Sequence, residues 1–114
     1  MSDCLFCKFV RDEIPTRLAY RDEKVMAFED INPQAPNHIL IIPTKHIASV
    51  NELTAEDSET VGQMYLIAQK IAQERGFAAD GYRAVINTGP NAGQTVFHLH
   101  LHLLAGRALR WPPG

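Results

Sequence analysis

The segment from His98 to Leu104 alternates histidine with leucine, and this pattern constrains the fold more than any other part of the sequence. Side chains on a β-strand point alternately to opposite faces, so a strand here places His98, His100 and His102 on one face and leucines on the other. We expect the leucine face to pack against a helix and the histidine face to point away from the core, towards solvent or a ligand. Three histidines stacked on one face are far more typical of a functional site than of packing.

The three histidines cannot all bind one metal ion. At a rise of about 3.3–3.4 Å per residue, the Cα atoms of His98 and His102 lie roughly 13 Å apart on a strand. Zinc needs each ligand nitrogen within about 2.1 Å, so two of the three histidines can share an ion but the third cannot. The other chemistry open to imidazole is acid–base or nucleophilic catalysis, because a reference pKa of about 6.5 leaves it largely neutral at pH 7.

Hydrophobic patterning predicts several strands, one short helix and one long helix. Apolar residues at helical spacing predict the short helix over residues 4–10. The long helix begins near Thr54, which forms a capping-box pattern with Asp57, and it ends near Gly76, where glycine can take the left-handed conformation. The predicted strands are 18–22, 25–29, 38–42, 82–87 and 95–104. We therefore expect an α+β fold with a mostly antiparallel sheet of about five strands.

Length and charge suit a single domain over residues 1–114, with a C-terminal tail from about residue 105. The longest apolar run, 39–42, is far shorter than the roughly 18 residues of a membrane span, and the first residues do not form a secretory signal. We therefore expect a cytoplasmic protein that does not enter a membrane. A formal net charge of −2 argues against nucleic acid as a partner. No Asp or Glu follows Asp80, so the last third of the chain repels an anionic ligand less than the rest.

Several common nucleotide-binding and hydrolase motifs are absent. The chain has no Gly-x-x-x-x-Gly-Lys-Ser/Thr loop, no Gly-x-Gly-x-x-Gly fingerprint and no Gly-x-Ser-x-Gly elbow. The turn from Gly89 to Gly93 offers backbone N–H groups to a phosphate, but two glycines alone are a weak signal. Two kinds of function remain for the histidines: reaction at a phosphorus atom, or binding of a metal ion.

The His98–Leu104 segment resembles the signature of the histidine triad (HIT) family of nucleotide hydrolases and transferases, and it is most similar to the Hint branch. The resemblance covers nearly the whole chain. It includes residues 28–36, the strand at 38–43, Lys45–His46, residues 93–96 and the terminal Trp-Pro-Pro-Gly. Two departures are Ala92 before Gly93, where glycine is common, and Arg110 before the tryptophan, where histidine is frequent. Both could alter leaving-group preference, because the family's tail reaches the partner subunit's site.

The resemblance implies a homodimer whose sheets join across a two-fold axis, with a purine nucleotide bound in each subunit. The implied reaction is hydrolysis of a purine nucleoside phosphoramidate, such as an AMP-amine, to the monophosphate. His100 would attack the α-phosphorus and form a nucleotidyl-histidine intermediate, and His38 would help to orient its ring. The implied binding residues are Phe6, Phe9, Phe28, Ile31 and Leu40 around the base, Asp30 at the ribose, and His102, Asn87, Gly93, Gln94 and Thr95 at the phosphate.

Cys4 and Cys7 form a C-x-x-C pair near the N-terminus. Without a secretory signal a structural disulfide is not expected, which leaves zinc binding, redox activity or burial as free thiols. Bacterial members of the family with this pair resemble zinc binders with a Cys₂His₂ shell, which implies the ligands Cys4, Cys7, His46 and His98. Such a zinc ion would be structural, because four protein ligands leave no open position. We expect no organic cofactor.

Other functions fit the same residues. Neighbouring branches of the family hydrolyse dinucleoside polyphosphates, and a nucleotide-binding adaptor with vestigial catalysis would keep the same pocket. A zinc hydrolase that uses the histidines directly is a further alternative. Uridylyl transfer is less expected, because His102 stands where uridylyltransferases carry glutamine.

Overall fold

Five strands form one antiparallel sheet in the computed structural model, which describes residues 4–114. Their spatial order is β1-β2-β3-β5-β4, so β1 and β4 lie at the two edges. The strands are β1 (Leu18–Arg21), β2 (Val25–Glu29), β3 (Asn37–Pro43), β4 (Arg83–Ile86) and β5 (Leu101–Ala105). This architecture confirms the predicted α+β class, and the first four strands lie within one residue of their predicted bounds.

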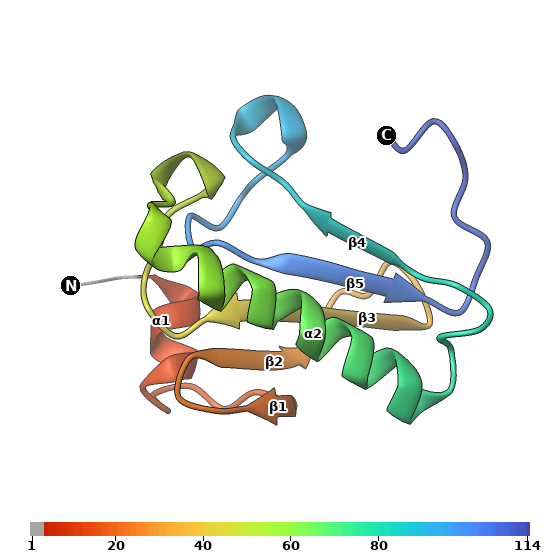
Figure 1. The fold of residues 1–114 in the computed structure, drawn as a ribbon, viewed down its shortest axis with the longest axis horizontal. Coiled ribbons are helices and arrows are strands. Elements are labelled where there is room, and N and C mark those ends of the chain that lie inside the picture. Colours follow the sequence, from red (N-terminus) through yellow and green to blue (C-terminus); the bar gives the residue numbers. More distant parts are fainter. Residues whose placement is uncertain (1–3) are drawn as a thin grey trace.

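The leucines of the alternating segment form part of the main core. Leu99, Leu101 and Leu103 are almost fully buried and pack with apolar residues of α2 (Ser58–Arg75) such as Met64 and Ile71. Figure 1 shows α2 lying across one face of the sheet. The predicted packing of the leucine face against the long helix is therefore confirmed.

The ends of α2 follow the predicted capping signals. The side chain of Asp57 accepts hydrogen bonds from the backbone N–H and the hydroxyl of Thr54, as in a capping box, although this first turn is a 3₁₀ turn (Ala55–Asp57). Gly76 ends the helix with a φ of 82°, a conformation that glycine adopts without steric cost. No helix among residues 4–114 combines the length and the hydropathy that a membrane span requires.

The last strand is shorter than predicted. The expected strand began at residue 95, whereas β5 begins at Leu101. Residues 98–100 leave the sheet ladder because their polar groups bond elsewhere: the N–H of Leu99 donates to the carbonyl of Ile47, and the ring of His98 bonds to the carbonyl of Pro43. Side-chain and loop hydrogen bonds thus replace strand pairing over the first half of the histidine segment.

The opposite face of the sheet holds a second cluster under α1 (Leu5–Val10). Phe6 of this helix packs with Met26, Phe28, Leu40 and Ile42. The histidines point to this face, away from α2. Of the two surroundings expected for them, solvent or a ligand, solvent does not apply to His98 and His100, which are 0% and 7% exposed. The ring of Phe6 lies edge-on to both histidine rings, because α1 covers them.

Truncation of Leu101 tests the assignment of the leucine face to the core. Because Leu101 is fully buried against α2, we expect Leu101→Ala to lower the free energy of unfolding by about 2–5 kcal/mol, measured by urea denaturation. Leu18→Ala is the matched control: Leu18 is 53% exposed on the edge strand β1, and its truncation should cost less than about 1 kcal/mol. Equal losses in the two variants would contradict the assignment.

Candidate functional site

One cavity of about 240 Å³ lies beside α1 and brings together most of the residues predicted to bind a nucleotide. Its lining includes Phe6, Phe9, Phe28, Leu40, Asp30, Ile31, Thr95, His100 and His102. Ile31 stands at the rim and is 96% exposed. Leu5, Thr16, Glu29 and Val96 also line the cavity and were not predicted. Helical spacing relates Leu5 to Phe9, but no sequence signal marks Thr16.

Aromatic side chains form the apolar wall of this cavity. Phe6 and Phe9 lie three residues apart on α1 and therefore share one face of the helix. Both rings meet Phe28 of β2 edge-to-face, with ring centroids 5.4 Å and 4.9 Å apart. Flat apolar surfaces of this kind suit a planar ligand such as a nucleobase.

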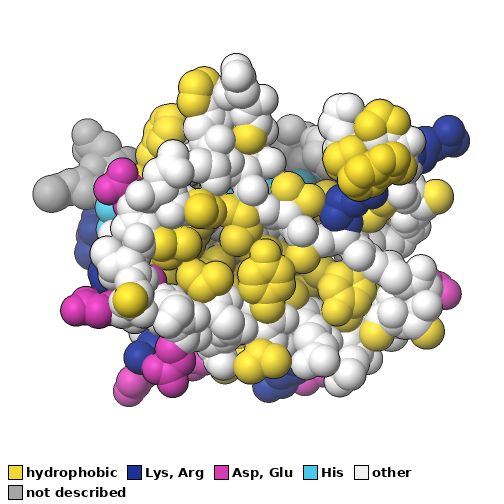
Figure 2. Space-filling model, turned by 45° about the horizontal axis from the view of Figure 1, so that its top comes forward, with side chains coloured by type: hydrophobic (Ala, Val, Ile, Leu, Met, Phe, Trp, Pro, Cys, Tyr) yellow, Lys and Arg dark blue, Asp and Glu magenta, His cyan; other side chains and the backbone are white. Residues whose placement is uncertain are grey.

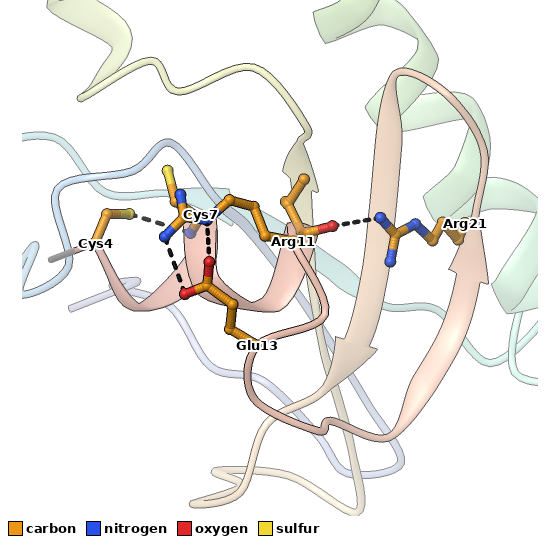
Figure 3. A network of polar contacts seen from close by, with 6 residues as sticks. Cys4, Cys7, Arg11, Glu13 and Arg21 are labelled. Carbon is orange, nitrogen blue, oxygen red and sulfur yellow. Dashed lines mark hydrogen bonds and ion pairs between the residues drawn. The ribbon is translucent and has the colours of Figure 1, made fainter. Parts of the chain in front are cut away.

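Polar contacts join the C-terminal end of α1 to the edge strand β1. The guanidinium of Arg21 donates to the carbonyl of Val10 and to the carboxylate of Asp12. Arg11 pairs with Glu13 at 2.6 Å (Figure 3). Most of these groups are exposed, so the ion pairs add little stability. Their effect is to hold the helix, and with it the aromatic wall, in one position.

The ring of His100 is oriented by a backbone carbonyl. Its Nδ1 lies 2.7 Å from the carbonyl oxygen of His98. A carbonyl oxygen only accepts, so Nδ1 must carry the proton, and in the neutral ring Nε2 then has a free electron pair. Burial lowers the pKa of His100, which favours this neutral form. A neutral, oriented imidazole that lines a cavity has the properties of a nucleophile.

A chain of hydrogen bonds places the proton of His102 on Nε2, whereas that of His100 is on Nδ1. The backbone N–H of Gln34 donates to Nδ1 of His38, and Nε2 of His38 lies 2.9 Å from Nδ1 of His102. With both rings neutral, His38 donates through Nε2–H and His102 keeps its own proton on Nε2. Burial is the main cause that lowers the pKa of His38 and lowers that of His102 to about 4, although Asp30 opposes both shifts. His102 therefore offers a donor beside the free nitrogen of His100.

The four predicted metal ligands also come together. One ligand atom from each of Cys4, Cys7, His46 and His98 lies within 4.8 Å of all the others. Nε2 of His98 donates to the carbonyl of Pro43 at 2.8 Å, which leaves Nδ1 free to face the sulfur of Cys4 at 3.4 Å. Two thiolates and two imidazoles in a compact group suit a tetrahedral ion such as zinc, and the backbone bond supplies the outer partner that metal-binding histidines use.

The remaining predicted phosphate ligands occupy different positions. Asn87 lines a second cavity, which it shares with His38 and His102. The amide of Gln94 donates to the carbonyls of Ala48 and Val96 and accepts from the N–H of Gly89, so this side chain holds the turn over residues 89–96 in shape. Neither Gln94 nor Gly93 lines the two cavities.

Comparison with protein families and with known proteins gives consistent matches. The model of the HIT domain matches residues 11–109. The purine nucleoside phosphoramidase of Escherichia coli is 50% identical over 107 residues, which are 94% of this chain and 90% of that protein. An uncharacterized HIT-like protein of Synechococcus elongatus is 52% identical over 98% of this chain and 97% of its own length.

Solved structures match with the same fold. A HIT family hydrolase from Legionella pneumophila is 49% identical and superposes with a TM-score of 0.96, covering 98% of this chain and all of the other. A histidine triad protein from Clostridium difficile is 43% identical, with a TM-score of 0.93 and 96% of each chain covered.

Acid should destabilise the fold through His102. Its pKa is about 4 in the folded protein and about 6.5 in an unfolded chain, so between these values the unfolded chain binds more protons. The free energy of unfolding should therefore fall as the pH drops from 6.5 to 4, measured as the urea midpoint at a series of pH values. His102→Gln keeps an acceptor for His38 but does not titrate, so its midpoint should fall less steeply. Parallel curves for the two proteins would refute the assignment.

Proposed function

The chain belongs to the HIT domain family, and from this premise we propose that it hydrolyses purine nucleoside 5′-phosphoramidates to nucleoside monophosphates. The observation that carries the proposal is the position of the His100 ring. The carbonyl of His98 holds the ring through Nδ1, so Nε2 is free, and the residue lines the same cavity as the aromatic wall. The identity to a named purine nucleoside phosphoramidase over nearly the full chain supports the choice of substrate.

The nucleotide would lie with its base between the aromatic residues and its phosphate at the histidines. Phe6, Phe9, Phe28, Ile31 and Leu40 would enclose the base, and the carboxylate of Asp30 would accept from the ribose hydroxyls. Thr95, which lines the cavity, would bind phosphate oxygens, whereas the backbone N–H groups of Gly93 and Gln94 donate to carbonyls within the turn. His102 would donate its Nε2–H to the phosphate. We assign Gln94 to holding the turn through its amide, and Asn87 to the phosphate from the side of the second cavity.

The reaction would proceed by two displacements at phosphorus. Nε2 of His100 attacks, an N–P bond to histidine forms, the P–N bond of the substrate breaks, and the departing nitrogen takes a proton and leaves as an amine. Water then attacks the same phosphorus, the bond to His100 breaks, and the monophosphate leaves. The departing nitrogen would take its proton from solvent, because a neutral His102 that gave up its Nε2 proton would become an imidazolate. His102 would keep this proton in a hydrogen bond to a phosphate oxygen, and the bond from His38 would hold it in the tautomer that can donate.

We propose that zinc holds the N-terminal end of α1. The donor set of Cys4, Cys7, His46 and His98 fits zinc in number, chemistry and spacing. With four protein ligands the ion has no open coordination position, so its role is structural. The chemistry at His100 needs neither this ion nor an organic cofactor.

We further propose a homodimer formed through the β4 edge. Among residues 4–114, this strand pairs with β5 on one side and with no strand on the other. Tyr65, Leu66 and Tyr82 are exposed hydrophobic residues, and Figure 2 shows hydrophobic side chains gathered across the face that carries α2 and β4. A second copy that continues the sheet would cover both features. The single domain over 1–114 and the cytoplasmic location stay predictions from the sequence.

Replacement of the nucleophile tests the reaction. We expect His100→Ala to lower the turnover of adenosine 5′-phosphoramidate by on the order of 10³-fold or more while AMP still binds, because the aromatic wall is intact. In the unmodified protein, rapid quenching at alkaline pH followed by mass spectrometry should find AMP attached to the peptide that contains His100. Turnover that survives in His100→Ala, or an adduct on another residue, would refute the mechanism.

Metal analysis tests the zinc site. We expect about one zinc ion per chain, a lower melting temperature after treatment with a chelator, and loss of zinc in Cys7→Ser. The chelator should not lower the melting temperature of Cys7→Ser any further, which serves as the control. A protein that contains no metal, or one whose melting temperature a chelator leaves unchanged, would contradict the proposal.

A further inference from the structure

Thr16 is a polar residue of the first cavity to which the proposed function gives no role. It lines the cavity beside α1 and belongs to the segment between α1 and β1. The residue is half-buried, and its hydroxyl makes no hydrogen bond with the described residues. A hydroxyl can both donate and accept a hydrogen bond, so Thr16 offers the cavity a polar group that the fold itself does not use.

The pairing of β1 with β2 fixes the position of Thr16. The N–H of Glu29 donates to the carbonyl of Arg17 at 2.9 Å, which continues the antiparallel pairing beyond the start of β1. In this register Thr16 lies opposite Asp30, and residues opposite each other place their side chains on the same face of the sheet. That face also carries Phe28, whose ring belongs to the aromatic wall. Thr16 is therefore held at the edge of the cavity where base and ribose are proposed to lie.

The other polar side chains of the cavity point elsewhere or have other roles. Side chains alternate along β2, so Glu29 faces α2, where its carboxylate pairs with Arg75. The remaining polar residues of the lining are already assigned to the ribose and the phosphate: Asp30, Thr95, His100 and His102. Among the polar side chains that line this cavity, Thr16 is the one left for the base.

A nucleobase has polar atoms around its edge as well as two flat apolar faces. The aromatic wall can cover the faces, but phenylalanine rings offer no partner of ordinary strength to the edge. A polar atom that enters an apolar cavity without a hydrogen-bond partner loses its bonds to water, which costs free energy of binding. One hydroxyl at the edge removes part of this cost. Because the hydroxyl can donate or accept, it suits adenine and guanine alike.

We propose that the hydroxyl of Thr16 hydrogen-bonds to a polar atom on the edge of the base and makes the cavity select for that atom. The inference rests on the proposed function, because it adds a base-recognition residue to that same site. A base that lacks the atom facing Thr16 loses this bond and leaves the hydroxyl without a partner, so it is bound and hydrolysed less well.

Analogues that lack one polar atom of adenine, combined with removal of the hydroxyl, test the inference. Adenosine 5′-phosphoramidate is compared with the corresponding compound of purine riboside, which lacks the amino group, and with the 1-deaza, 3-deaza and 7-deaza compounds. We expect Thr16→Val, which replaces the hydroxyl by a methyl group of similar size, to lower kcat/KM for the adenosine compound by roughly three- to tenfold. One analogue should be slower by a similar factor in the unmodified protein, and Thr16→Val should not slow that analogue further.

Two further variants serve as controls. Thr16→Ser keeps the hydroxyl and should keep the preference for adenosine over the slow analogue. Thr60→Val makes the same substitution at another half-buried threonine, which lies on α2 and lines neither cavity, so it should leave every rate unchanged. An unchanged rate in Thr16→Val, or an equal loss for the adenosine compound and all four analogues, would overturn the inference and leave the proposed function intact.

Binding separates the inference from the proposed function. If no phosphoramidate is hydrolysed, the proposed function fails, and calorimetry then compares AMP with the monophosphates of the same four analogues. Weaker binding of one analogue to the unmodified protein, with no further loss in Thr16→Val, supports the inference. Equal affinity of the unmodified protein and Thr16→Val for AMP overturns it, as does an absence of AMP binding.

Discussion

Hydrogen bonds between histidine rings and the backbone are the interactions on which the site depends. The carbonyls of Pro43 and His98 each fix the proton of one ring nitrogen, and the N–H of Gln34 fixes the acceptor nitrogen of His38. A neutral imidazole has one donor and one acceptor, so each bond decides which nitrogen faces the ligand. The same kind of contact thus leaves Nδ1 of His98 facing the sulfur of Cys4 and leaves Nε2 of His100 as a free acceptor.

The two faces of the sheet carry different parts of the structure: the main hydrophobic core lies on one face and the candidate site on the other. Leucines of the alternating segment pack under α2, while the intervening histidines lie under α1. Residues of α1 belong to both parts of the candidate site, because Cys7 lies in the cysteine–histidine cluster and Phe6 lines the cavity beside α1. The position of one short helix therefore sets the geometry of both the cluster and the cavity.

Short sequence patterns predicted the features that depend on neighbouring residues in the chain. Alternation placed Leu101 in the core, and the capping pattern at Thr54 marked the 3₁₀ turn after which α2 begins at Ser58. The early end of pairing at Leu101 could not be predicted, because it results from bonds to residues some fifty positions away in the chain. The metal ligands and the aromatic wall came from the family resemblance. The second cavity depends on how the tail folds back, which no sequence motif records.

Nitrogen-15 NMR of the histidine side chains at pH 7 tests the assignment of the ring nitrogens most directly. The chemical shifts of Nδ1 and Nε2 report which nitrogen carries the proton. We expect His100 to be neutral with its proton on Nδ1 and His102 to be neutral with its proton on Nε2. A proton on Nε2 of His100, or a doubly protonated His102 at this pH, would contradict the structural basis of the proposed catalysis.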